Sequence, residues 1–211
     1  MSSIKRGVAL IYRIIIVIVT LIALYLNFKL LSFRMGILYF TNISNLLCLI
    51  YFLILVIMMI LKKEKNDDLH YIVKGMVTMC ITLTMFVYNF ILVGDKSVFE
   101  NHMLECNLVH VVVPLLVIFD YIIFGVKGNL KKIYPFIWTM VLFIYQIFIT
   151  IYMILGGEFA NGAKYPYFYM DTSKYGVLGV FFNTLIILVV YIVYGKLIQV
   201  LDNKIGKKNI K

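Results

Sequence analysis

Charged residues are scarce in this sequence. Of its 211 residues, 14% are Asp, Glu, Lys or Arg, whereas 63% are hydrophobic. Soluble domains carry about 25% charged and about 45–50% apolar residues. A water-soluble fold could not enclose so much apolar surface, so lipid must be the solvent for most of the chain. The composition therefore excludes an ordinary soluble domain.

Cysteine is also rare, and its placement argues against a cysteine-ligated metal protein and against a disulfide-stabilised fold. The three cysteines, Cys48, Cys80 and Cys106, have no spacing typical of metal ligands, and two of them lie inside apolar runs. We therefore expect free thiols and no disulfide framework. The sequence predicts neither a metal site nor a cofactor.

Acidic residues are half as numerous as basic ones, and the net charge is +10. A strongly basic chain is a candidate for nucleic-acid binding. Here, however, Lys and Arg gather in the short gaps between apolar runs, an arrangement that sets the orientation of a membrane protein. We therefore expect no nucleic-acid partner.

Six long apolar runs make up most of the sequence, and each can cross about 30 Å of hydrocarbon as a helix. The predicted fold class is all-α, a polytopic membrane bundle of six transmembrane helices in a single domain, residues 1–211. We place the helices near residues 8–28, 36–61, 71–94, 105–126, 134–155 and 175–201. The first run is too long for a signal peptide and lacks a small-residue cleavage site, so we expect a retained anchor.

The basic residues predict the orientation. Taking the gaps alternately, one side of the membrane carries thirteen Lys and Arg residues and the other carries five. The thirteen are Lys5, Arg6, Lys62, Lys63, Lys65, Lys127, Lys131, Lys132, Lys196, Lys204, Lys207, Lys208 and Lys211, and the five are Lys29, Arg34, Lys96, Lys164 and Lys174. The more basic side faces the cytoplasm, so we expect both termini there. Abundant Ile, Lys and Asn indicate an AT-rich bacterial genome and hence the bacterial cytoplasmic membrane.

Polar residues inside the apolar runs are costly in lipid, so they usually face the bundle interior. Thr41, Asn89 and His110 come from three runs, and each lies five residues from the predicted outer end of its helix. At 1.5 Å per residue, all three lie about 7–8 Å below that end. They are expected to form one polar layer, although such residues more often serve as interhelical hydrogen bonds.

His110 lies inside an apolar run, whereas His70 and His102 lie at helix ends or in loops. A neutral imidazole can take a proton from a hydroxyl and return it later. Thr41 can supply that hydroxyl, which would make a nucleophile–base pair. The spacing alone leaves a structural hydrogen bond as the alternative role of His110.

Two charged residues lie closer to the inner side. Lys74 is near the inner end of the third run, and Asp120 is ten residues past His110, about 15 Å further in. Their similar depth predicts a structural ion pair, with a proton relay as the alternative. Arg13, near the inner end of the first run, is expected to extend to the membrane interface.

Several segments together resemble a known family. They are residues 39–47 (YFTNISNLL), 110–116 (HVVVPLL) with Asp120 after them, 134–138 (YPFIW), 164–168 (KYPYF) before Asp171, and 175–176 (YG) before Asn183. In order and content they resemble the bacterial Pr-six-Pr family of six-helix membrane proteins over nearly the whole chain. More distantly, Phe40-Thr41, His110 before a proline, and Tyr165-Pro166 are similar to the eukaryotic androgen-induced and androgen-dependent (AIG-like) family.

The second resemblance implies a chemistry. Members of that family are described as transmembrane threonine hydrolases, which cleave fatty acid esters of hydroxy fatty acids with a Thr and a His. The matching motifs carry those roles onto Thr41 and His110. The implied partner is a membrane lipid or lipid-like ester, and the chemistry needs no cofactor.

Such a reaction needs hydrogen-bond donors for the carbonyl oxygen and a group that orients the histidine. The candidates that would donate to the oxygen are Asn42, Asn45, Asn89 and Tyr165. The candidates that would orient His110 are Asn107 and Asp171, because Asp120 lies too deep.

Two alternative functions stay open. One is a lipid or small-molecule transporter, although we find neither an internal repeat nor broken helices. The other is a structural protein whose polar stripes only hold helices together.

Overall fold

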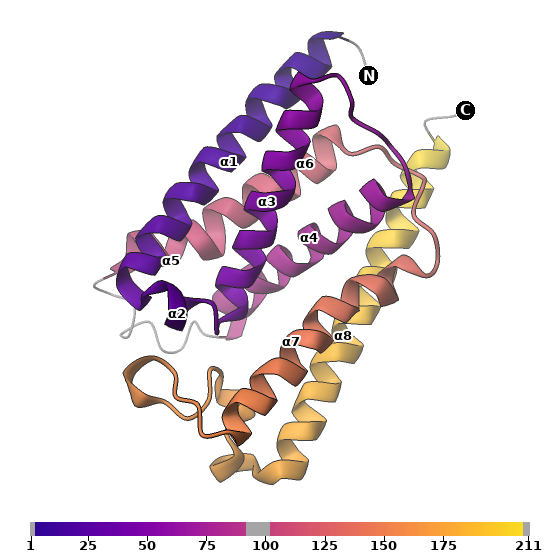
Figure 1. Cartoon of the computed structure of the whole chain (residues 1–211). Helices are drawn as coiled ribbons and strands as arrows, with labels where there is room; N and C mark the ends of the chain where they lie inside the picture. The colour runs from indigo at the N-terminus through magenta and orange to yellow at the C-terminus, as the bar shows by residue number, and fades with distance from the viewer. Residues whose placement is uncertain (1–2, 92–101, 209–211) are drawn as a thin grey trace. The chain divides into compact units, whose positions relative to one another are not determined.

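The computed structural model describes residues 3–91 and 102–208, in which every regular element is a helix (Figure 1). Six helices in these ranges are long and apolar enough to cross a membrane. They are Ile4–Leu31, Phe40–Ile60, Asp68–Phe90, Met103–Phe124, Tyr134–Ile154 and Thr172–Lys207. The predicted all-α class with six transmembrane helices is confirmed, and the chain is a multi-pass membrane protein.

The chain divides into two compact units, of which the first comprises Met1–Gly36 and Phe40–Val126. Its elements are α1 (Ser3–Leu31), α2 (Phe33–Gly36), α3 (Phe40–Ile60), α4 (Asp68–Phe86), η1 (Val87–Ile91), α5 (Met103–Asn107), η3 (Leu108–Val112) and α6 (Val113–Phe124). Two of these are π-helical turns: η1 continues α4, and η3 joins α5 to α6. The first unit therefore holds four of the six membrane-spanning helices.

The core of the first unit lies where α1 faces α3. Ala9, Ile16 and Ala23 of α1 are all completely buried, and their spacing of seven residues puts them on one face of the helix. They belong to one hydrophobic cluster with Phe52 and Met59 of α3. Alanine has a small side chain, so the two helix backbones can approach closely. Isoleucines and leucines cover the outer faces, as expected for helices that lipid surrounds.

The second unit comprises Ile37–Tyr39 and Lys127–Lys211. Helices α7 (Tyr134–Ile154) and α8 (Thr172–Lys208) are joined by a loop that contains the 3-10 turns η4 (Ala160–Gly162) and η5 (Phe168–Met170). Gly176, with φ +66°, interrupts the winding of α8 near its start. At the other end, Asn203 bonds both backbone polar groups of Leu130. These bonds join α8 to the segment that leads into α7.

The observed helix ends differ from the predicted ones. Helices α1 and α8 continue past the predicted ranges 8–28 and 175–201, because backbone hydrogen bonds can extend a helix beyond its apolar stretch. The structure does not test the prediction of a single domain over residues 1–211. The predicted end of the third helix at residues 92–94, together with Lys96 and Lys211, lies outside the described residues.

The largest difference is at the start of the second predicted helix. Residues 36–39 were expected to be helical, but α2 ends at Gly36 and α3 begins at Phe40. Side chains take the carbonyl groups that a continuous helix would use. Asn42 Nδ2 donates to Gly36 O at 3.1 Å, and the Tyr145 hydroxyl donates to Leu38 O at 2.9 Å. Thr41 therefore lies in the first turn of α3, not one turn inside it.

Two glycines, Gly128 and Gly206, allow a close backbone approach in the second unit. A Cβ atom on Gly206 would overlap the backbone of Gly128 and Lys127. We predict that Gly206→Ala lowers the free energy of unfolding by about 1–3 kcal/mol. The matched control is Gly7→Ala, whose Cβ would meet nothing within 4 Å. Thermal unfolding in detergent, followed by circular dichroism, checks this, and equal midpoints for the two variants would contradict it.

Candidate active site

Thr41 and His110 are in direct contact. Thr41 Oγ1 lies 3.2 Å from His110 Nε2, although the two residues are 69 positions apart. The first turn of α3 carries Thr41, and the π-helical turn η3 carries His110. Both side chains are half-buried. A hydroxyl–imidazole pair is thus assembled from two helices of the first unit.

The second ring nitrogen determines which atom of the pair donates. His110 Nδ1 lies 2.8 Å from the backbone oxygen of Cys106. A carbonyl can only accept, so Nδ1 carries the ring proton and Nε2 of the neutral imidazole is an acceptor. The Thr41 hydroxyl therefore donates to Nε2. A backbone carbonyl already occupies the Nδ1 proton, so neither Asn107 nor Asp171 is needed to hold it.

Tyr88 covers one face of the imidazole. Its ring stacks on that of His110, with centroids 4.1 Å apart and an interplanar angle of 14°. Tyr88 lies in η1 and His110 in η3, so both rings project from π-helical turns. Such turns are rare and frequently occur at functional sites. The sequence analysis missed Tyr88, whose only local indication was the neighbouring Asn89 in the same apolar run.

The asparagines expected to stabilise an oxyanion donate to backbone carbonyls. Asn45 Nδ2 donates to Thr41 O at 2.8 Å and to Val109 O at 3.0 Å. Asn45 thereby joins α3 to η3 beside the pair, and both of its N–H groups are used. The Nδ2 atoms of Asn42 and Asn89 donate to Gly36 O and Met85 O, and each amide has a second N–H.

Tyr165 and Asp171 belong to the second unit, where they interact with each other. The Asp171 carboxylate accepts from the Ser173 hydroxyl at 2.5 Å and from two backbone N–H groups at the start of α8, which is an N-terminal cap. The hydrogen bond from Ser173, followed by that from Tyr165, lowers the pKa of Asp171. The bond to Asp171 in turn raises the pKa of Tyr165. The contacts of these two residues are thus explained within their own loop.

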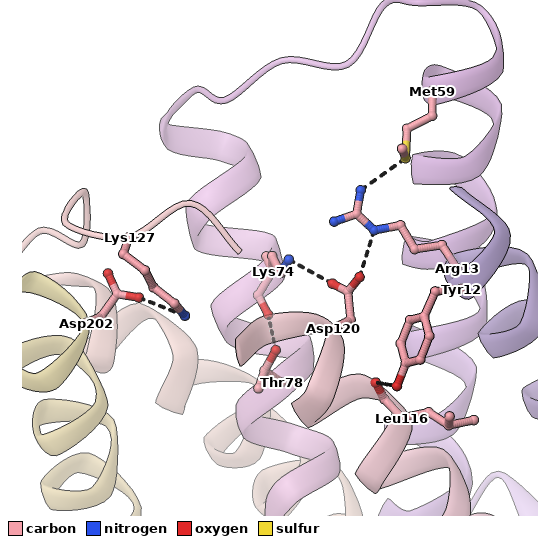
Figure 2. A network of polar contacts seen from close by, with 9 residues as sticks. All are labelled: Tyr12, Arg13, Met59, Lys74, Thr78, Leu116, Asp120, Lys127 and Asp202. Atoms are coloured by element: carbon pink, nitrogen blue, oxygen red, sulfur yellow. Dashed lines mark hydrogen bonds and ion pairs between the residues drawn. The ribbon is translucent and has the colours of Figure 1, made fainter. Parts of the chain in front are cut away.

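A second polar cluster of the first unit surrounds Asp120 (Figure 2). Asp120 Oδ1 lies 2.8 Å from Arg13 Nε, and Oδ2 lies 2.8 Å from Lys74 Nζ. The exposed fractions are 0% for Asp120, 6% for Arg13 and 5% for Lys74. Lys74 and Asp120 thus form an ion pair, as the sequence analysis expected.

The expectation for Arg13 was wrong. Arg13 does not extend to the interface but turns inward, where Nη1 also reaches the Met59 sulfur at 3.0 Å. An ionised carboxylate in a medium of low polarity attracts a cation strongly, and Asp120 is that carboxylate. Sequence analysis could not choose between these two positions, because a long basic side chain can reach either.

The described residues contain no group of three or more His, Cys, Asp or Glu side chains that could hold a metal ion. Cys48, Cys80 and Cys106 are buried free thiols, as predicted.

The fold and the site together define a class of protein: a multi-pass α-helical membrane protein with a threonine–histidine pair. No protein-family model, curated protein or solved structure matches the chain.

The Asp120 cluster leads to a prediction about stability. Asp120→Asn removes the carboxylate charge that contacts both Arg13 and Lys74, so these two buried cations lose the counter-ion they share. We expect a loss of about 3–5 kcal/mol in the free energy of unfolding. Asp202→Asn is the comparison, because the ion pair of Asp202 with Lys127, at 3.3 Å, is longer than either ion pair of Asp120. Unfolding midpoints in detergent measure both losses, and a smaller loss for Asp120→Asn than for Asp202→Asn would refute the prediction.

Proposed function

We propose that this protein hydrolyses carboxylic esters of lipids within the membrane, with Thr41 as the nucleophile and His110 as the general base. The observation that supports this most is the 3.2 Å contact between Thr41 Oγ1 and His110 Nε2. An activated nucleophile requires a base within hydrogen-bond reach and a third group that orients the base. The Cys106 carbonyl is that third group, and the stacked Tyr88 ring limits rotation of the imidazole.

The reaction has two steps. His110 Nε2 takes the proton of Thr41 while Oγ1 attacks the ester carbonyl carbon, and a tetrahedral intermediate forms. The ester C–O bond then breaks, the leaving alcohol takes the proton from His110, and the acyl group stays on Thr41. Water then attacks the acyl group with His110 again as the base, which releases the fatty acid and restores the Thr41 hydroxyl.

The negative charge on the carbonyl oxygen needs donors close to Thr41. The first backbone N–H groups of any helix have no acceptor inside that helix, and a helix N-terminus favours negative charge. Thr41 is the second residue of α3, so its oxygen lies beside that turn. The second N–H groups of Asn42 and Asn89 are further candidates. Asn45 is a positioning residue, because it holds Thr41 against η3.

The surroundings of the pair suit a lipid substrate. Phe86 and Phe90, on the same helix as Tyr88, are 50% and 73% exposed. These exposed apolar side chains put the helix that carries Tyr88 in contact with the hydrocarbon, in which a lipid ester would dissolve. The resemblance described above favours fatty acid esters of hydroxy fatty acids as the substrate. The charge distribution supports an orientation with both termini in the cytoplasm. The abundance of Ile, Lys and Asn favours a bacterial cytoplasmic membrane.

Substitution of either member of the pair tests the mechanism. Thr41→Ala and His110→Ala should each reduce hydrolysis at least about a thousandfold, because nucleophile and base act as a unit. Thr41→Ser, which keeps the hydroxyl, should stay active. The assay is fatty acid release in micelles, from 4-methylumbelliferyl oleate and from a fatty acid ester of a hydroxy fatty acid. An acyl adduct on Thr41, trapped by rapid quench and located by mass spectrometry, would identify the nucleophile directly.

Two matched controls separate chemistry from folding. Thr82 donates its hydroxyl to a carbonyl of its own helix, Thr78 O, at 2.7 Å. Thr82→Ala should therefore retain hydrolysis. His70→Ala should retain it as well, because the His70 ring contacts Tyr51 and Tyr71 and takes no part in the proposed reaction. Wild-type activity in Thr41→Ala or His110→Ala would disprove the mechanism and leave the pair as a helix-packing contact.

Orientation is tested separately, by cysteine labelling in intact cells. All three native cysteines are buried and can be replaced by alanine. A single cysteine in place of the exposed Lys63 should resist a membrane-impermeant maleimide until the cells are opened. One in place of Lys164 should react at once. The reverse pattern would contradict the proposed orientation, whatever the outcome of the hydrolysis assay.

A further inference from the structure

Pro114 leaves one backbone carbonyl of η3 without its helical donor. The π-helical winding of η3 passes into α6 through the hydrogen bond from Val113 N to Leu108 O. In the same register the next carbonyl, Val109 O, would accept from the amide of residue 114, but proline has no N–H. Val109 and Pro114 are both buried. A buried carbonyl needs a donor, so Val109 O requires one from another helix.

Asn45 of α3 supplies that donor. Its Nδ2 atom donates to Val109 O at 3.0 Å and to Thr41 O at 2.8 Å, and the Asn45 side chain is completely buried. The first bond uses the carbonyl that Pro114 leaves open, and the second holds the backbone of Thr41. His110 directly follows Val109 in the chain. One amide group therefore connects the residue before the imidazole to the residue that carries the hydroxyl.

The α3 side of this connection is also held by other bonds. Thr41 O accepts from the Ser44 hydroxyl at 2.9 Å, and Ser44 Oγ lies 2.8 Å from Thr84 Oγ1 of α4. Ser44 and Thr84 are both buried. Because α3 stays tied to α4 without Asn45, loss of the bond between Asn45 and Val109 would displace η3 and leave α3 in place.

Pro114 also favours the π-helical winding itself. The ring of a proline inside an α-helix clashes with the carbonyl of the residue four positions earlier, which here is His110. A π-helical turn closes over one more residue than an α-helical turn, which gives the ring room. The winding of η3 in turn sets the direction in which the imidazole leaves the helix.

We propose that Pro114 is a positioning residue for the Thr41–His110 pair and acts through Val109 O and Asn45. By withholding an N–H from Val109 O, it reserves that carbonyl for α3 and keeps η3 in its π-helical winding. Both effects hold His110 Nε2 at 3.2 Å from Thr41 Oγ1. The consequence for hydrolysis rests on the proposed function, whereas the consequence for the hydrogen bond of the pair does not.

Replacement of the proline by alanine tests the proposal. Pro114→Ala restores an N–H that competes with Asn45 for Val109 O, and alanine favours helix, so the variant should fold. We expect kcat for ester hydrolysis to fall about a hundredfold with KM nearly unchanged, because a misplacement of about 1 Å costs that much. Pro135→Ala is the matched control and should keep its kcat. Pro135 lies in the first turn of α7, where a helix needs no N–H donor.

Nuclear magnetic resonance of the imidazole nitrogens detects the pair without an assay of activity. The chain has three histidines, so ¹⁵N-histidine labelling gives few ring signals, and His110→Gln identifies those of His110. Thr41→Val gives the Nε2 signal of a ring that lacks its hydroxyl partner. Pro114→Ala should move the signal toward that position, and Pro135→Ala should not. An unchanged His110 signal in Pro114→Ala would overturn the proposal, whether or not the wild-type protein hydrolyses esters.

A double variant separates positioning from stability. Asn45→Leu removes the donor to Val109 O and should lower the unfolding midpoint in detergent. Addition of Pro114→Ala supplies an N–H to the same carbonyl, so the double variant should regain most of the lost midpoint. It should regain neither the His110 signal of the wild type nor its hydrolysis. A double variant no more stable than Asn45→Leu would contradict the assignment of Val109 O as the carbonyl that Pro114 leaves open, and with it the proposal.

Discussion

The first unit depends on how Asp120 is neutralised inside apolar helices. A carboxylate cannot stay ionised in hydrocarbon without partners, and here the partners come from two other helices. Arg13 of α1 and Lys74 of α4 both contact Asp120 of α6. The hydrophobic effect does not drive α1, α4 and α6 together in lipid, so the ion pairs hold these three helices at one depth. The apolar packing of α1 on α3 then sets the remaining contacts of the unit.

The Thr41–His110 pair follows the same rule at a lower cost, since its members are neutral. Each polar group satisfies another: Thr41 donates to His110, His110 donates to Cys106 O, and Asn45 joins the carbonyls of Thr41 and Val109. Such a network also stabilises the contact between α3 and η3. The direction of the Thr41 proton and the two π-helical turns favour a hydrolase. The Cys106 carbonyl at Nδ1 and the stacked Tyr88 ring orient the imidazole.

The second unit is built differently. Its two long helices are joined at one end by Asn203 and Asp202 bonding to the segment at residues 127–130, and they carry an aromatic loop at the other. Tyr39 of the α2–α3 turn belongs to this unit and accepts from Ala160 N at 3.1 Å. Burial raises the pKa of the Tyr39 phenol, and it raises the pKa of Tyr169, in the loop between α7 and α8, to about 12. These phenols therefore stay neutral hydrogen-bonding groups at physiological pH.

The sequence by itself determined the all-α class, the six membrane-spanning runs and the free thiols, because long apolar runs with few charges have few other physical solutions. It also brought Thr41 and His110 into one layer by depth, and Lys74 and Asp120 into another. It could not predict the inward turn of Arg13, the stacking of Tyr88 or the Cys106 carbonyl at Nδ1. Nor did it predict the break at residues 37–39, where side chains compete for backbone carbonyls. Each of these depends on contacts between residues far apart in the chain or on local winding of the helix. Periodicity determines which face of a helix is polar, but only the tertiary structure decides which partner meets it.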